Sequence, residues 1–157
     1  MNNSYKADIK RSDYSDANIA IVSTDWNSDI TNLLAQGAED TLRARNAAVE
    51  RFTVPGAIEL TYAAQRLADS ECFDAIIVCG CVIKGDTPHF DYVCQSVTQG
   101  VTSLNTDGLV PVIFCVLTVL DRNQAVDRCG GSAGHKGIEA AETALAMIDF
   151  NYNVNEL

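Results

Sequence analysis

One nearly unbroken apolar run constrains the fold of this chain more than any other feature. The run FDAIIVCGCVI spans residues 73–83, and after its single aspartate it holds only apolar residues and glycine. It is too short to span a membrane, and it lacks the polar alternation of a strand with one solvated face. The run therefore predicts a central β-strand that is buried on both faces.

The segments around this strand alternate between two patterns. Short apolar or β-branched runs that end at turn residues predict further strands at residues 18–24, 49–54 and 110–119. Apolar residues at three-four spacing predict helices after residues 27, 56, 87 and 137, with a short helical stretch over residues 122–129. Such alternation winds into a parallel sheet with helices on both faces. We expect an α/β fold: a three-layer α/β/α sandwich with a four-stranded parallel sheet, similar to flavodoxin.

The chain length of 157 residues suits one domain. The polar N-terminus predicts a mobile leader over residues 1–17, and the periodic patterns predict a single domain over residues 18–150. Residues 151–157 are expected to form a C-terminal tail.

Composition and charge argue against several classes of protein. The formal net charge of -10 disfavours binding to nucleic acid, which needs a basic footprint. No signal region or apolar run of ~20 residues is present, so we expect a soluble, cytoplasmic protein without membrane contact. The six cysteines have no CxxC spacing and are not in ligand spacing with the two histidines. We expect reduced thiols and no metal.

The most polar junction directly follows the central strand. In an open parallel sheet, ligands bind beyond the carboxyl ends of the strands, where the strand-to-helix junctions meet. Within KGDTPHFDY, residues 84–92, Thr87 and Pro88 are typical of a helix start. The amides of Gly85, Asp86 and Thr87 would then lie at the positive end of the helix dipole, which favours an anion such as phosphate.

His89 would lie in the first turn of that helix. The dipole disfavours the imidazolium there, so a neutral ring could exchange protons with a substrate. Taken alone, each residue favours a plain structural role: His89 as a surface histidine, Lys84 as a solvated loop cation and Asp86 as an accessory helix cap. The carboxylate of Asp86 would have to point away from a bound phosphate.

Other junctions offer further candidates. Trp26, the only tryptophan, is either an aromatic platform at the binding edge or a core residue. Glu59 either stabilises a helix start or accepts hydrogen bonds from a substrate. Arg128 and Lys136 accompany the glycine-rich segment over residues 130–137, which lacks the P-loop ending GK[ST] but favours an anion site over a plain connection.

As a set, these segments resemble the lumazine synthase family, whose enzymes catalyse the penultimate step of riboflavin biosynthesis. They follow the family's order and spacing over residues 19–148, and VPGAIE together with IKGDTPHFDYV is a specific combination. The matching segments are STDWN, VPGAIEL, FDAIIVCGCVIKGDTPHFDYV, PVIFCVLT and DRCGGSAGHKGIEAA.

The resemblance implies a reaction and a set of site residues. The family condenses 5-amino-6-(D-ribitylamino)uracil with 3,4-dihydroxy-2-butanone 4-phosphate to 6,7-dimethyl-8-ribityllumazine, phosphate and water, without a metal or organic cofactor. By this resemblance His89 would transfer protons, and Gly85, Asp86, Thr87 and Arg128 would bind the butanone phosphate. Ribitylaminouracil would be bound by Trp26, Ala57, Ile58, Glu59, Cys81, Val82, Ile83, Phe114 and Lys136.

The resemblance also implies an assembly. Family members form pentamers, many of which build icosahedral shells of 60 subunits, and a neighbouring subunit supplies part of each site. Phe114 would face the pyrimidine across that interface. The uninterrupted span from Arg128 to Lys136 favours the shell-forming type, and riboflavin synthase is a further candidate partner.

Several residues depart from the family's usual pattern. Ile58 stands where an aromatic residue is common, Cys115 where glycine is common, and Asp86 where a small residue or glutamate is common. None of these changes removes a group that the chemistry needs. The glycine-rich segment is altered at Cys129, Ser132 and His135.

Two other functions stay open. A flavodoxin-like binding module could hold a phosphate or flavin without turnover, but it would not explain why Lys84, His89, Arg128 and Lys136 all match one enzyme family. A pathway paralogue kept mainly as a structural shell would form particles without turnover.

Overall fold

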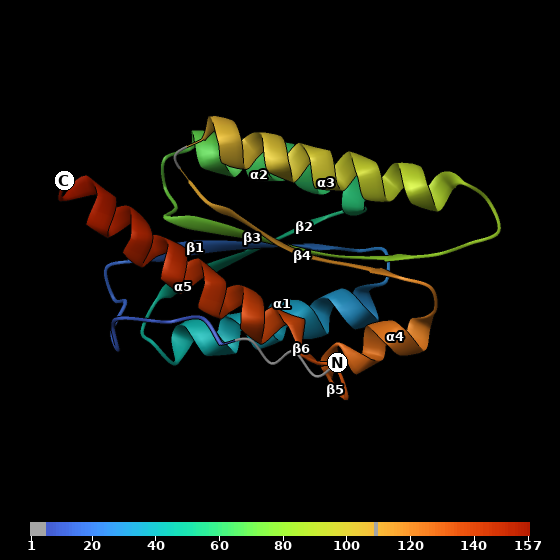
Figure 1. Cartoon of the computed structure of the whole chain (residues 1–157), viewed down its shortest axis with the longest axis horizontal. Helices are drawn as coiled ribbons and strands as arrows, with labels where there is room; N and C mark the ends of the chain where they lie inside the picture. Colours follow the sequence, from blue (N-terminus) through green and yellow to red (C-terminus); the bar gives the residue numbers. More distant parts are fainter. Residues whose placement is uncertain (1–5, 109) are drawn as a thin grey trace.

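The computed structural model describes residues 6–108 and 110–157 and has a sheet between two helical layers (Figure 1). In chain order, its elements are β1 (Asn18–Thr24), α1 (Ser28–Arg43), β2 (Ala48–Val54), α2 (Ala57–Asp69), β3 (Ala75–Ile83), α3 (His89–Asp107), β4 (Val112–Val119), α4 (Arg122–Asp127), β5 (Cys129–Gly131), β6 (Gly134–His135) and α5 (Lys136–Asn155). Helices α2 and α3 cover one face of the sheet, and α1 and α5 cover the other.

The main sheet has four parallel strands in the order β2-β1-β3-β4. Strand β3 lies between β1 and β4, and its residues Ala75–Cys81 are all buried. The predicted central strand and the three-layer, flavodoxin-like α/β fold are therefore confirmed.

The side chains of β3 alternate between two hydrophobic cores. Ile77 and Cys79 pack in the core with α1 and α5, whereas Ile76 and Val78 pack in the core with α2 and α3. Both faces of the strand meet an apolar layer, which explains why the sequence of β3 has no polar alternation.

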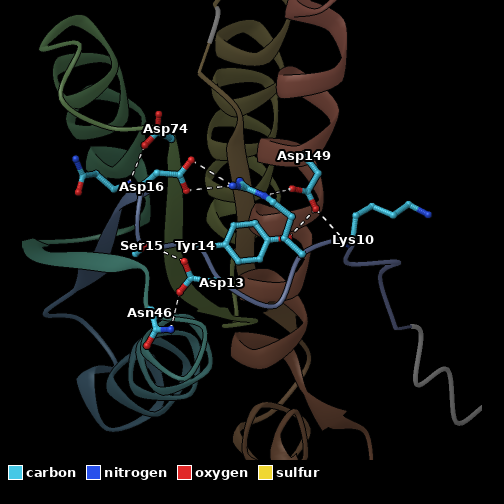
Figure 2. A network of polar contacts seen from close by, with 10 residues as sticks. Lys10, Asp13, Tyr14, Ser15, Asp16, Asn46, Asp74 and Asp149 are labelled. Atoms are coloured by element: carbon cyan, nitrogen blue, oxygen red, sulfur yellow. Dashed lines mark hydrogen bonds and ion pairs between the residues drawn. The ribbon is translucent and has the colours of Figure 1, made fainter.

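The segment before β1 differs from the predicted mobile leader. Residues 1–5 lie outside the described residues, but the side chain of Tyr14 is fully buried. Tyr14 Oη donates to Asp149 Oδ2 at 2.6 Å, and Arg11 Nε donates to Asp149 Oδ1 at 2.9 Å; Figure 2 shows this network. The packed domain therefore begins before residue 18, because the buried carboxylate of α5 takes its hydrogen-bond donors from this segment.

The structure also differs from the sequence-based boundaries after β4, at the end of α5 and at the start of α3. The glycine-rich segment forms a small antiparallel hairpin, β5 with β6, rather than an irregular loop. Helix α5 continues to Asn155, so most of the expected tail over residues 151–157 is helical. Helix α3 begins at His89, and Pro88 occupies the N-cap position instead of the first helical position.

Two further properties concern the helices and the cysteines. Within residues 6–108 and 110–157, no helix combines the length and apolar character needed to cross a bilayer. All six cysteines are free, and Cys79, Cys81 and Cys115 are buried.

Candidate active site

The carboxyl ends of β1, β2 and β3 open into a cavity of about 370 Å³, which we call the junction cavity. Three strand-to-helix junctions meet there because parallel strands all end at the same edge of the sheet. The cavity brings together most of the predicted site residues: Trp26, Ala57, Ile58, Glu59, Cys81, Val82, Ile83, Gly85, Thr87 and His89.

Trp26 occupies the turn between β1 and α1. Its side chain is 75% exposed, so it is a surface platform at the cavity and not a core residue. Its backbone is held from two sides, because Trp26 N donates to Pro55 O at 3.0 Å and Trp26 O accepts from Thr24 Oγ1 at 2.8 Å. An exposed ring on a fixed backbone can stack on a flat ligand without prior rearrangement.

The start of α2 contributes a carboxylate and an apolar side chain. Glu59 lies in the first helical turn, where the dipole stabilises its charge, and Gly56 precedes the helix. A Cβ atom on Gly56 would lie 3.1 Å from Glu59 Oε2, so glycine leaves that carboxylate room. Ile58 is 47% exposed and lines the cavity.

The segment from Lys84 to His89 is exposed throughout and leads into α3. Lys84 N donates to Val119 O at 2.9 Å, which ties the start of the segment to the end of β4. His89 N contacts Thr87 Oγ1 at 3.4 Å, so Thr87 contributes weakly to the helix start. Gly85, Thr87 and His89 all line the junction cavity beside the positive end of this long helix.

Asp86 and Cys81 differ from their neighbours in what they can contribute. Asp86 is exposed and, unlike Gly85 and Thr87, does not line the junction cavity. Burial raises the pKa of the Cys81 thiol to about 11. Cys81 therefore stays protonated near neutral pH and is a poor nucleophile.

The other three predicted site residues do not line the junction cavity. Phe114, Arg128 and Lys136 line a second cavity of about 470 Å³ along β4, which we call the edge cavity. Arg128 Nη1 donates to Gln124 O at 2.9 Å, and Lys136 Nζ forms an ion pair with Glu139 at 2.8 Å. The two cavities share no lining residue, so one chain does not bring the full predicted set together.

Sequence reasoning missed five residues that line the junction cavity. Of these, Asn27 carried a readable signal, since asparagine in a turn directly before a helix often adopts unusual backbone angles. The other four are Thr24, Gly56, Phe90 and Val93.

No cluster of three or more His, Cys, Asp or Glu side chains within the described ranges could hold a metal ion. The groups that the junction cavity offers are an indole, a carboxylate, an imidazole and a helix start. Together they can stack on a heterocycle, bind hydroxyl groups, hold an anion and transfer protons.

A parallel α/β sheet with a cavity at the carboxyl ends of its strands defines the class of α/β proteins that bind small molecules. Comparisons with known proteins narrow this class. The profile of the 6,7-dimethyl-8-ribityllumazine synthase family matches residues 16–151. The chain belongs to this family, and it is a transferase of riboflavin biosynthesis.

Three curated relatives, each named 6,7-dimethyl-8-ribityllumazine synthase, illustrate the similarity. The protein of Bacteroides fragilis is 50% identical over 139 residues, which cover 87% of this chain and 97% of the relative. That of Porphyromonas gingivalis is 53% identical over 135 residues, which cover 84% of each chain. That of Parabacteroides distasonis is 49% identical over 142 residues, which cover 88% of this chain and 89% of the relative.

Proposed function

We propose that this chain condenses 5-amino-6-(D-ribitylamino)uracil with 3,4-dihydroxy-2-butanone 4-phosphate in the junction cavity, giving 6,7-dimethyl-8-ribityllumazine, phosphate and water. Membership of the family supports the reaction. The observation that carries the assignment of the site is that Trp26, Glu59 and His89, from three separate junctions, line a single cavity.

The uracil substrate would bind between the first junction and the end of β3. Trp26 stacks on the pyrimidine, and Glu59 accepts hydrogen bonds from the ribityl hydroxyl groups. Backbone groups of Cys81, Val82 and Ile83 bind the pyrimidine edge, beside Ala57 and Ile58. The exposure of the Trp26 ring and the protonated state of the Cys81 thiol both support this arrangement.

The butanone phosphate would bind at the start of α3. The amides of Gly85, Asp86 and Thr87 and the helix dipole hold the phosphate. Gly85 and Thr87 line the junction cavity, which supports this assignment, whereas Asp86 does not line it.

His89 would transfer protons. Imine formation, phosphate elimination and ring closure each move a proton, and a histidine at the cavity can serve as donor and acceptor. Much of the remaining acceleration would come from holding two substrates in register.

We further propose that a neighbouring subunit completes each site. The separation of the edge cavity, with Phe114, Arg128 and Lys136, from the junction cavity supports a shared site. In such an assembly Phe114 faces the pyrimidine, and Arg128 binds the phosphate. A pentamer, further assembled into a 60-subunit shell, is the arrangement that the family suggests, and light scattering on the purified protein would measure its size.

We also propose that the protein is cytoplasmic and that it associates with riboflavin synthase. The six free cysteines support a reducing compartment. Association with riboflavin synthase would be tested by co-purification of the two proteins.

The activity is tested by giving the purified protein both substrates. We expect the fluorescent lumazine to form together with one equivalent of phosphate. Product formation no faster than the uncatalysed background would overturn the proposal. Assembled particles without turnover would instead favour the structural paralogue.

A further inference from the structure

The backbone on both sides of Trp26 is fixed although its ring is exposed. Beyond the contacts of Trp26 itself, Thr31 Oγ1 donates to Thr24 O at 2.7 Å, and both threonine side chains are buried. These bonds join the Trp26 turn to β1, α1 and the start of the β2–α2 junction. None of these bonds ties the turn to β3.

Asn27 makes the contact with β3. Its Nδ2 donates to Cys81 O at 2.9 Å. Pairing between β1 and β3 ends at Ser23 with Cys79, whereas β3 continues to Ile83. The side-chain amide of Asn27 therefore takes the place of a backbone partner for a carbonyl beyond the last strand pair, in a strand region that is largely buried.

The backbone of Asn27 is also specific. Its angles, φ 57° and ψ 39°, lie in the left-handed region, which asparagine tolerates better than most residues. Glycine would fit these angles but could not bond Cys81. The side chain of Asn27 does not cap α1, so its amide group serves the contact with β3.

We propose that Asn27 is a positioning residue that fixes the indole of Trp26 over the pyrimidine site by tying its turn to the end of β3. This inference rests on the proposed function, because it takes Trp26 as the platform for ribitylaminouracil. Asn27 itself makes no contact with reacting atoms in this assignment.

The test uses Asn27→Gly, which keeps the backbone conformation, and Asn27→Asp, which keeps the side-chain shape but loses the donor. For both variants we expect KM for ribitylaminouracil to rise about threefold to tenfold, the range that corresponds to one aromatic contact. KM for the butanone phosphate should stay unchanged. Time-resolved fluorescence anisotropy should report faster local motion of Trp26, the only tryptophan in the chain.

Asn46→Gly is the matched control. Asn46 also has a left-handed backbone, φ 66°, and its Nδ2 donates to Asp13 Oδ1 at 2.6 Å, but it does not line the junction cavity. Its KM values and anisotropy should match those of the unmodified protein. Circular dichroism would establish that all the variants fold.

Trp26→Ala separates the two proposals. If it raises KM for ribitylaminouracil while both Asn27 variants keep normal KM and anisotropy, the positioning role is overturned and the proposed site stands. If Trp26→Ala leaves KM unchanged, the proposed stacking site fails, and the role of Asn27 fails with it.

Discussion

His89 and Arg128 lie in different cavities of one chain but are assigned to the same reaction. His89 is exposed at the start of α3, where it can reach a bound ligand. Arg128 is half-buried and is held by Gln124 O, so its guanidinium is oriented before any anion binds. The two side chains should therefore affect different kinetic constants.

We expect His89→Ala to lower kcat by about 10²- to 10⁴-fold with little change in either KM, because it removes a proton-transfer group and not a binding contact. Arg128→Ala should chiefly raise KM for the butanone phosphate, by about tenfold or more, because it removes a charge-assisted contact. Steady-state kinetics with each substrate varied in turn would measure both effects.

Arg43→Ala is the control for loss of a surface arginine, since Arg43 pairs with Glu39 on α1 and lines neither cavity. Its kinetics should be unchanged. Equal losses in kcat and KM for both site variants would contradict the separate roles.

Residues at the ends of buried strands were the most predictable part of the site. Trp26, Glu59 and His89 follow different strands, and parallel topology alone brings such positions to one edge. Asn27 was missed because its role depends on a carbonyl of β3, 54 residues away in the sequence. The family resemblance is confirmed, but the roles it assigns to individual residues stay predictions.

At the scale of elements, the N-terminal segment and α5 stabilise each other through Asp149. Burial raises the pKa of Asp149, but the hydrogen bonds from Tyr14 and Arg11 outweigh burial and hold that pKa below its usual value. Burial and the bond to Asp149 also raise the pKa of Tyr14 to about 12, so its hydroxyl stays a donor across the physiological range. The segment thus acts as part of the fold.

Asp149→Asn should lower the free energy of unfolding at neutral pH by about 2–4 kcal/mol, because Arg11 loses a partly buried partner. A carboxylate with a depressed folded-state pKa stabilises the protein above its unfolded-state pKa and loses this effect as pH falls through the folded-state value. The variant should therefore lose less stability than the unmodified chain as the pH falls below the ordinary aspartate pKa of about 4. Urea titrations at several pH values would measure both effects.

Asp127→Asn is a control for this change, because Asp127 is exposed at the end of α4. Its stability should stay within about 0.5 kcal/mol of the unmodified protein. An Asp149→Asn variant as stable as this control would show that the N-terminal segment is not held by the carboxylate.

His135 joins α5 to α1 at a narrow contact. Its ring lies against Gly37, where a Cβ atom would come within 2.2 Å of Cε1, and Nδ1 accepts from Ile138 N at 3.3 Å. Burial lowers the pKa of His135 below its ordinary value of 6.5, despite the nearby Glu139. The neutral ring is the form that can cap α5.

Protonation of His135 should destabilise the fold. Because its pKa is lower in the folded chain, the unfolded chain binds the proton more readily, and stability should decrease as pH falls through about 6.5 toward the folded-state value. His135→Asn should remove this pH dependence. His89→Asn, the same change at an exposed histidine, should keep it, and an identical pH profile for all three proteins would contradict the prediction.

Strands were easier to predict than the segments that pack outside the sheet. The first strand, residues 18–24, was predicted at its observed bounds, since a buried strand has an apolar signature of its own. The role of residues 11–17 was missed, because a polar segment carries no sign that Tyr14 meets a buried carboxylate 135 residues later. The extension of α5 to Asn155 was missed for a related reason, since its last turns carry little apolar periodicity.

At the scale of the whole molecule, the central question is whether the junction cavity of one subunit meets the edge cavity of another. Strand β4 is one of the two outer strands of the main sheet, and its Phe114 is 42% exposed and lines the edge cavity with Arg128 and Lys136. An aromatic ring and two cations in a shallow cavity are suited to complete a site that lacks them.

Co-expression of His89→Ala chains with Arg128→Ala chains should therefore restore activity. If each site takes His89 from one subunit and Arg128 from its neighbour, random mixing leaves about a quarter of the sites with both residues intact. The specific activity of the mixed assembly would be measured against each variant alone.

The control mixes His89→Ala chains with Glu59→Ala chains. Both residues line the junction cavity of the same subunit, so no mixed site would be intact and activity should stay at the level of the variants. No recovery with Arg128→Ala would place the whole site within one subunit, whereas recovery in this control would show that His89 and Glu59 act from different subunits.

The association of subunits could not be predicted from residue patterns in the sequence alone. Local patterns report which face of an element is buried, but the residues of β4 and α5 that would meet a neighbour look like ordinary surface positions in one chain. The resemblance to the family predicted that Phe114 reaches the site from a neighbouring subunit. In one chain, Phe114 and the junction residues line two separate cavities.

If a neighbouring subunit completes each site, as proposed, the separation of the two cavities has a consequence for how the protein matures in the cell. A newly made subunit would fold with the Trp26 ring exposed, but it would lack the Phe114, Arg128 and Lys136 of a neighbour. It would therefore be inactive. Turnover would begin only when subunits meet. The specific activity of a preparation would then depend on the fraction of chains that are assembled and not on the fraction that are folded. Dilution below the concentration at which the subunits stay associated would abolish the activity.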